Sequence, residues 1–282
     1  MYDIAIIGSG PAGISAAINA KILDKNFIWF ASLNVSKKVG QAEHVKNYLG
    51  LPDISGKELS KAFSDHAQSL GIKPVDKVVN GVYSGGNCFT LLAGNEDFTA
   101  KTVILCLGVD TAKIEGEEGL VGRGISYCAT CDGFMYRGKK IAILCTDKRF
   151  EHEVEFLCSV ASKAFVLPLY KGYEIKSDNA EIILKSPVKF EGKERLEKII
   201  FKDGSLEVDG LFILRSSVSP SILLHGLEIN EGHIVVDRAM RTNIKGVFAA
   251  GDCTGRPYQY MKAAGEGNVA LHSAVEYLAE NK

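Results

Sequence analysis

Short apolar runs of strand length alternate along this chain with longer stretches whose apolar residues recur at helical spacing. Residues 4–7 and 27–31 have the pattern of buried strands, and residues 11–23 between them have helical spacing, which together predict a β-α-β start. Further strands are predicted at residues 102–107, 140–144, 164–169, 210–214 and 247–250, with a last helix over about 263–279. The alternation predicts an α/β fold built of layers.

The order of these elements indicates two domains. The strand at 140–144 begins a second β-α unit, whereas the strand at 247–250 is followed by residues that suit the ligand of the first domain. We therefore expect two Rossmann-like, three-layer domains of the dinucleotide-binding type, the second inserted into the first. The first would comprise residues 1–110 and 237–282, and the inserted domain residues 111–236. Two crossing segments would form a natural hinge.

A glycine-rich turn follows the first predicted strand and opens the first helix. It reads Gly8-Ser9-Gly10-Pro11-Ala12-Gly13 and fits G-x-G-x-x-G in the context that this motif requires. Gly8 permits the tight turn, Gly10 lets the backbone approach a diphosphate, and Gly13 lets helix and strand pack closely. The helix N-terminus would bind the anion. The acidic residue that often follows the second strand is missing, so Ser32 or backbone groups would hold the ribose.

Composition and charge exclude several classes of protein. The formal net charge is -1 over 282 residues, which gives no indication of nucleic-acid or anionic-membrane binding. No apolar run approaches the roughly 20 residues that span a bilayer. The first residues lack the basic start and cleavage site of a signal peptide, so a cytoplasmic protein is expected.

The segment Cys128-Ala129-Thr130-Cys131-Asp132-Gly133 is the most informative one for chemistry. Two cysteines at this spacing can form a reducible disulfide, and Asp132 could move a proton during thiol release. The alternative is half of a structural zinc site, which needs four ligands. Because no second Cys pair occurs and the 6 histidines are scattered, we expect redox chemistry and no metal. The other five of the 7 cysteines are isolated, which is typical of inert buried thiols.

Together these motifs, with the segment 246–252, make the chain resemble the low-molecular-weight thioredoxin reductases over nearly its whole length. The resemblance implies FAD as cofactor, thioredoxin as substrate, a homodimer, and a disulfide domain that rotates. It implies that Asp252 binds the ribitol chain of FAD and that Cys131 lies nearer the flavin than Cys128. The FAD contacts that it implies beyond Gly8–Gly13 are Phe30, Ser32, Lys38, Gln41, Asn47, Val79, Gly108, Gly251, Asp252, Gln259 and Tyr260.

The inserted domain departs from that family where NADPH should bind. The second glycine-rich loop is replaced by residues 145–150, in which Cys145, Asp147 and Phe150 stand for small residues. Asp147 would repel a diphosphate by roughly 4 kcal/mol at 4 Å and an effective dielectric of 20. The His-Arg-Arg segment that binds the 2′-phosphate is missing, and a third glycine motif is replaced by residues 214–217.

These losses predict a thioredoxin reductase that does not use NADPH, similar to the ferredoxin-dependent flavin thioredoxin reductases. Ferredoxin would supply electrons through FAD and the Cys128–Cys131 disulfide to thioredoxin. Three alternatives stay open at this point. The donor could be a deazaflavin, a second flavin or residual NAD(P)H. The protein could instead be a small-molecule dithiol oxidase, or a non-catalytic flavin-binding redox sensor.

Overall fold

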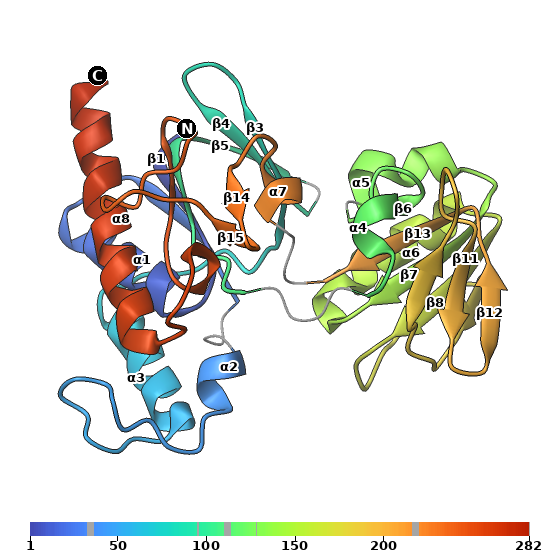
Figure 1. Cartoon of the computed structure of the whole chain (residues 1–282), viewed down its shortest axis with the longest axis horizontal. Coiled ribbons are helices and arrows are strands. Elements are labelled where there is room, and N and C mark those ends of the chain that lie inside the picture. Colours follow the sequence, from blue (N-terminus) through green and yellow to red (C-terminus); the bar gives the residue numbers. More distant parts are fainter. Residues whose placement is uncertain (33–36, 95, 110–113, 128, 216–219, 282) are drawn as a thin grey trace. The chain divides into compact units, whose positions relative to one another are not determined.

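The computed structural model of the chain describes residues 1–32, 37–94, 96–109, 114–127, 129–215 and 220–281. Of Lys37, Lys38, Glu118 and Cys131 it describes the backbone. The chain forms two compact units (Figure 1). Unit 1 comprises Met1–Val109 with Ser219–Lys282, and unit 2 comprises Asp110–Val218.

Unit 1 is built on a six-stranded sheet in which one long strand serves two purposes. The carboxyl half of this strand, β5, lies in a parallel layer, and its amino half continues into an antiparallel meander. The buried side chains of Ile4, Ile104 and Phe248 come from three neighbouring strands of the parallel layer. The parallel strands are β1 (Tyr2–Ile7), β2 (Phe27–Phe30), β5 (Glu96–Leu105) and β16 (Val247–Ala249); β4 (Phe89–Ala93) and β3 (Val79–Ser84) complete the meander.

Helices α1 (Pro11–Ile22) and α8 (Tyr260–Glu280) pack side by side in unit 1 (Figure 1). Their close approach depends on Gly267, where an added Cβ would lie 2.1 Å from the Ala12 carbonyl oxygen. The short helix α2 (Lys37–Gly40) precedes α3 (Gly56–Ser69). Helix α3 begins at a capping box, in which Ser55 and Glu58 satisfy each other's backbone N–H groups.

The chain returns to unit 1 earlier than the sequence predicted. The predicted boundary lay between residues 236 and 237, whereas the structure puts it between 218 and 219. The segment concerned contains α7 (Pro220–Leu223), which packs against β3, and a hairpin of β14 (Ile229–Asn230) and β15 (His233–Ile234). Because these short elements bury their apolar side chains in unit 1, they belong to it. The first boundary lies at Val109, one residue from the predicted 110.

Unit 2 contains a five-stranded parallel sheet and a three-stranded antiparallel sheet. The parallel strands lie in the order β6 (Ile125–Ser126), β13 (Gly210–Leu214), β7 (Lys140–Cys145), β8 (Lys163–Pro168) and β9 (Ala180–Ile182). The antiparallel strands are β10 (Lys189–Glu191), β11 (Lys198–Phe201) and β12 (Gly204–Glu207). The helices are α4 (Glu117–Leu120), α5 (Ala129–Asp132) and α6 (Glu151–Val160), with 3-10 turns η1 (Gly133–Tyr136) and η2 (Lys148–Phe150). The predicted α/β class is confirmed.

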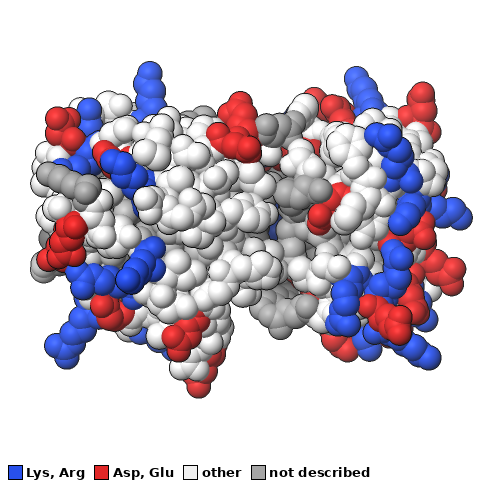
Figure 2. All heavy atoms as spheres, turned by 90° about the horizontal axis from the view of Figure 1, so that it is seen from above, with Lys and Arg blue, Asp and Glu red and all other residues white. Residues whose placement is uncertain are grey.

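Charged side chains of both signs are intermingled on the visible face of unit 2 (Figure 2). Lys189, for example, lies 3.1 Å from Glu115 and 3.3 Å from Glu191. The face therefore presents no extended field of one sign that would by itself select a charged partner. No helix within the described ranges is both long and apolar enough to cross a bilayer.

Candidate functional site

The glycine-rich turn lies at the carboxyl end of β1, and close packing requires two of its three glycines. Gly8 has φ +131°, and an added Cβ there would lie 2.1 Å from the Cys106 carbonyl oxygen. At Gly13 the Cβ would lie 2.0 Å from the carbonyl oxygen of Gly8. The Trp29 indole also donates to that oxygen at 2.8 Å. The turn is therefore fixed by its own sheet and helix.

Gly10 is different, because packing within the described chain does not require it. It is the N-cap of α1 with φ -79°, and an added Cβ would meet none of the described atoms within 4 Å. No side chain caps the helix there, and Pro11 occupies the first helical position. The first amides of a 12-residue helix thus face a space that glycine keeps clear, which fits the diphosphate of a dinucleotide.

The second half of the site is the turn at Gly251 and Asp252, which follows β16. Gly251 has φ +90°, and a Cβ there would lie 3.1 Å from the Cβ of Ala12. Asp252 begins a 3-10 turn, η3 (Asp252–Thr254). The two predicted glycine segments, far apart in sequence, therefore meet at the N-terminus of α1.

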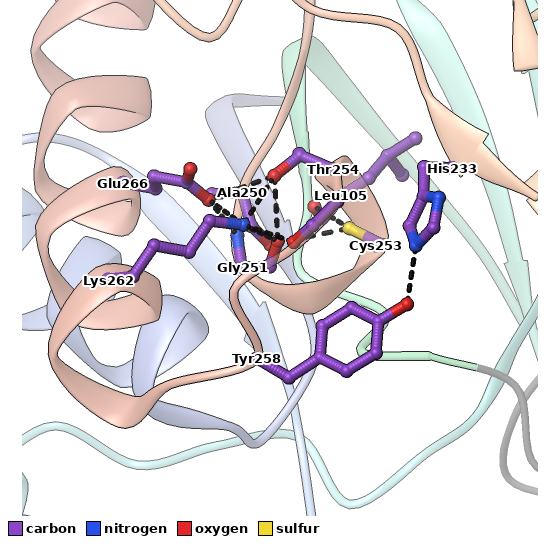
Figure 3. A network of polar contacts seen from close by, with 10 residues as sticks. Leu105, His233, Ala250, Gly251, Cys253, Thr254, Tyr258, Lys262 and Glu266 are labelled. Carbon is purple, nitrogen blue, oxygen red and sulfur yellow. Dashed lines mark hydrogen bonds and ion pairs between the residues drawn. The ribbon is translucent and has the colours of Figure 1, made fainter. Parts of the chain in front are cut away.

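Two residues that the motifs did not indicate, Lys262 and Glu266, hold this turn (Figure 3). The Lys262 ammonium donates to the carbonyl oxygens of Gly251 at 2.9 Å and Gly255 at 2.8 Å. The Glu266 carboxylate accepts from the Gly251 amide at 2.9 Å and lies 3.1 Å from Lys262. Their i,i+4 spacing was visible, but it is equally typical of a solvent-exposed helix pair. Only the fold shows that this pair binds a turn.

Two predicted cofactor residues from distant segments meet directly. The Asn47 side-chain amide donates to the Gln259 side-chain oxygen at 3.3 Å. Gln259 is the N-cap residue of α8, and Tyr260 is its first residue. Burial, and after it the nearby Asp252 carboxylate, raises the pKa of Tyr260. Asp252 and the N-terminus of α8 therefore lie at the same end of unit 1.

The remaining predicted cofactor residues lie on several different elements of unit 1. Phe30 is buried at the end of β2, Ser32 is partly exposed just beyond it, and Val79 is buried at the start of β3. Gly108 follows β5 with φ +72°. Gln41 lies in the loop after α2. The side chain of Lys38 lies outside the described part of the chain.

In unit 2 the redox segment follows β6. Cys128 lies outside the described residues, and Cys131 is described by its backbone within the single-turn helix α5, which ends at Asp132. Gly133 is packed so closely that an added Cβ would lie 2.8 Å from the Phe156 ring. Immediately after it, Phe134 and Met135 are 58% and 64% exposed. The predicted disulfide is thus followed by apolar side chains on the surface.

The isolated cysteines behave as predicted for buried thiols, with one exception. Cys106, Cys145, Cys158 and Cys253 are buried, whereas Cys88 is partly exposed. Burial raises the pKa of Cys145, Cys158 and Cys253 to about 11, and it raises the pKa of Cys106 well above its ordinary value. Within the described ranges, no three His, Cys, Asp or Glu side chains are grouped so that they could hold a metal ion.

Carboxylates of the chain itself occupy the loop and the helix start where the second glycine motif would bind phosphate, and the Arg149 guanidinium lies 3.4 Å from one of them, Asp147. The Asp147 side chain accepts from the Arg149 amide at 3.2 Å and so caps η2. At the start of α6, Glu151 accepts from the Tyr170 hydroxyl at 2.6 Å and from the Glu174 amide at 3.0 Å. Phe150 between them is buried. The helix N-terminus that would attract a diphosphate is therefore already supplied with negative charge.

Comparisons with known proteins show which family the chain is similar to. A family model for pyridine nucleotide-disulphide oxidoreductases matches residues 2–146 and 173–267. A thioredoxin reductase of Aquifex aeolicus (strain VF5) is 33% identical over 279 residues, covering 89% of this chain and 85% of that protein. A thioredoxin reductase of Listeria monocytogenes is 29% identical over 304 residues, covering 100% and 95%. A solved ferredoxin-flavin thioredoxin reductase of Clostridium acetobutylicum is 45% identical with a TM-score of 0.94, covering 99% and 98%.

Proposed function

The chain belongs to the pyridine nucleotide-disulphide oxidoreductase family, among the homologues of thioredoxin reductase, and we propose that it reduces thioredoxin with electrons from reduced ferredoxin. FAD would be its cofactor, and Cys128 and Cys131 its redox-active pair. The observation that carries the choice of donor is that Asp147 and Glu151 occupy the start of η2 and α6 in unit 2. The solved relative named as a ferredoxin-flavin thioredoxin reductase supports the same choice.

The charges of Asp147 and Glu151 and the size of Phe150 both disfavour NADPH binding at this site. A diphosphate at the N-terminus of α6 would face the carboxylates of Asp147 and Glu151, both of which already have donors within the chain. Even half of the roughly 4 kcal/mol repulsion between two charges at 4 Å and an effective dielectric of 20 would weaken binding more than tenfold. Buried Phe150 fills the place where a small residue would let a nucleotide approach.

The two glycine turns of unit 1, at residues 8–13 and 251–252, fit FAD. Gly10 leaves the amides of α1 accessible, and Gly251 lets the Asp252 turn approach α1. Bound FAD would supply the change between one-electron and two-electron transfer that joins a ferredoxin to a disulfide. The chain's own contribution is to hold the cofactor. The α1 amides would bind the diphosphate, and Asp252 the ribitol. Lys262 and Glu266 keep the Asp252 turn in place.

At the redox pair, reduction breaks the Cys128–Cys131 sulfur–sulfur bond and takes up two electrons and two protons. The dithiol then attacks the thioredoxin disulfide through a mixed disulfide, returning two electrons and two protons to the partner. Asp132 directly follows Cys131 and would deliver or accept a proton there. Phe134 and Met135, which follow the pair in the chain and are exposed, offer apolar side chains for a protein substrate.

Anaerobic stopped-flow absorbance tests the donor. The flavin-loaded protein is mixed separately with reduced ferredoxin, NADPH and NADH. We expect rapid bleaching with ferredoxin and none with either nicotinamide. Rapid bleaching by NADPH would show that the loop of residues 145–150 still binds nucleotide, and the donor assignment would be wrong.

The disulfide is tested in the same protein by Cys131→Ser, with Cys88→Ser as the control because Cys88 is a partly exposed cysteine of unit 1. We expect Cys131→Ser to abolish thioredoxin reduction while FAD stays bound, and Cys88→Ser to leave both unchanged. A fully active Cys131→Ser variant would exclude this pair as the redox centre.

A further inference from the structure

Glu117 is a carboxylate in the interior of unit 2, with 1% of its side chain exposed. It accepts hydrogen bonds from three separate segments. The Ile114 amide donates to Oε2 at 3.1 Å, and the Tyr127 hydroxyl donates to Oε1. The Arg215 guanidinium also binds Oε1, at 2.8 Å. One buried carboxylate therefore joins three places in the chain.

One of the three segments leads directly into the redox pair, and the other two lie near the ends of unit 2 in sequence. Ile114 and Arg215 are the described residues of unit 2 that lie closest in sequence to its two boundaries with unit 1, at 109/110 and 218/219. Tyr127 directly precedes Cys128. Tyr127 and Arg215 follow the carboxyl ends of β6 and β13, which are parallel neighbours. The Arg215 guanidinium lies over the Tyr127 ring, 5.2 Å from its centroid.

Burying the Arg215–Glu117 ion pair costs desolvation free energy, so its presence calls for an explanation. Arg215 is 12% exposed, so both charges of the pair have lost most of their water, and such a pair is weak evidence for stability alone. Arg215 also stands in the segment 214–217 that replaces a glycine motif of the related reductases. Arg215 contacts neither the predicted FAD residues of unit 1 nor the carboxylates of Asp147 and Glu151 in the contacts described above. Its contacts instead lead to the residue before Cys128.

We propose that Arg215, Glu117 and Tyr127 are positioning residues of the Cys128–Cys131 pair. They fix the backbone that leads into Cys128, and so raise the effective concentration of its sulfur at Cys131. Since the equilibrium constant for closing a disulfide is proportional to that concentration, the cluster stabilises the disulfide against external thiols. This inference rests on the proposed function, because it assumes that the two cysteines exchange.

The equilibrium with glutathione measures this effect directly. In the exchange, the dithiol and one glutathione disulfide give the protein disulfide and two glutathione thiols. The flavin-loaded wild type and its variants are equilibrated in glutathione buffers, quenched and alkylated, and the two cysteines are quantified by mass spectrometry. For Arg215→Met we expect about a tenfold smaller equilibrium constant, equivalent to a potential ~30 mV less negative.

Two further variants separate positioning from a general loss of structure. Tyr127→Phe keeps the ring beneath the guanidinium and removes only the hydroxyl that binds Glu117, so it should shift the equilibrium in the same direction by a smaller factor. Arg215→Lys keeps the charge without the planar fork and should recover part of the loss. The control is Lys163→Met, which breaks an exposed ion pair to Glu181 (2.9 Å) in the same unit and should leave the equilibrium unchanged.

The outcomes distinguish this inference from the function on which it rests. If the wild type exchanges but Arg215→Met and Tyr127→Phe both stay within twofold of it, the positioning role is wrong and the proposed function stands. If Arg215→Met does not fold, Tyr127→Phe alone decides. A wild type whose two cysteines do not exchange at all overturns both.

Discussion

Asn47 and Gln259 lie 212 residues apart along the chain, yet the Asn47 side-chain amide donates to the Gln259 side-chain oxygen at 3.3 Å. The contact joins the loop before α3 to the N-cap of α8. The resemblance to the related reductases predicts, for each of these two residues separately, a position near the flavin. Their hydrogen bond therefore brings two predicted cofactor contacts into one place.

Asn47→Ala and Gln259→Ala should each weaken FAD binding by about fivefold, or ~1 kcal/mol, because each removes one polar partner at the cofactor. The double variant should lose less than the sum, since the two side chains bind each other. FAD fluorescence on titration of the apoprotein measures the affinities. Asn19→Ala is the control, because Asn19 also donates one bond, to the Ser15 carbonyl within α1 at 2.8 Å. Strict additivity would mean that the two residues act separately.

Gly10→Ala tests whether a ligand uses the space at the start of α1. The backbone accepts alanine there, since φ is -79° and the added Cβ meets none of the described atoms within 4 Å. We expect the apoprotein to keep its melting temperature while FAD affinity falls by at least tenfold. Gly265→Ala, also unobstructed but within α8, should leave FAD binding unchanged. Unaltered FAD affinity in Gly10→Ala would show that the diphosphate lies elsewhere.

Lys262→Met should weaken FAD binding through the Asp252 turn. The change removes charged hydrogen bonds to the Gly251 and Gly255 carbonyls, each worth about 1.5–3 kcal/mol, and leaves Glu266 without its ion pair. Lys61→Met is a matched control, because it breaks another i,i+4 helix pair, Lys61–Asp65, which is exposed. We expect a loss of FAD from Lys262→Met during gel filtration and none from the control. Equal retention would assign the Lys262 pair to stability only.

The sequence predicted the glycine turns and seven buried parallel strands because their cause is local, whereas it missed the antiparallel strands β3, β4 and β10–β12. Gly210–Leu214 was predicted with its observed bounds, and α1 to within one residue, since buried runs and a proline at the helix start mark these elements. Gly13 follows from the same local geometry because its added Cβ would meet the Gly8 carbonyl oxygen, whereas Gly8 is also constrained by the distant Cys106 carbonyl.

What the sequence could not predict depends on contacts between distant segments. The hairpin β14–β15 carries too few residues for a periodic pattern, so its membership of unit 1 shows only in the fold. Asp147 was predicted to repel a phosphate, but its capping of η2 requires the actual turn. The contact of Arg215 with the Tyr127 ring likewise forms only once β6 and β13 lie side by side.

Thiol labelling should separate the cysteines by burial. In the oxidised protein at pH 8, a maleimide should modify partly exposed Cys88 within minutes. A pKa of about 11 leaves roughly one thiol in a thousand ionised at this pH, so Cys145, Cys158 and Cys253 should stay unlabelled. Brief reduction should add two labels, at Cys128 and Cys131. Peptide mapping by mass spectrometry identifies them, and early labelling of Cys158 would contradict its burial.

Stability at alkaline pH should depend on the same buried thiols. Burial raises the pKa of Cys158 from an ordinary value of 9.0 to about 11. As the pH rises above 9, the unfolded chain therefore loses this proton before the folded chain does. The thiol's contribution is fully present below pH 9 and is lost between pH 9 and 11, by about 1 kcal/mol at pH 10.

The comparison of wild type with Cys158→Ala isolates this effect from other titrations, which both proteins share. At pH 8 the variant should unfold at lower urea concentration, because it leaves a small cavity in unit 2. The difference in free energy of unfolding between wild type and variant should narrow by about 1 kcal/mol at pH 10, since only the wild type loses stability by ionising this thiol when it unfolds. Cys88→Ala is the control, because it makes the same substitution at a partly exposed thiol. A gap that stays constant from pH 8 to pH 10 would mean that Cys158 ionises as readily in the folded protein as in the unfolded chain.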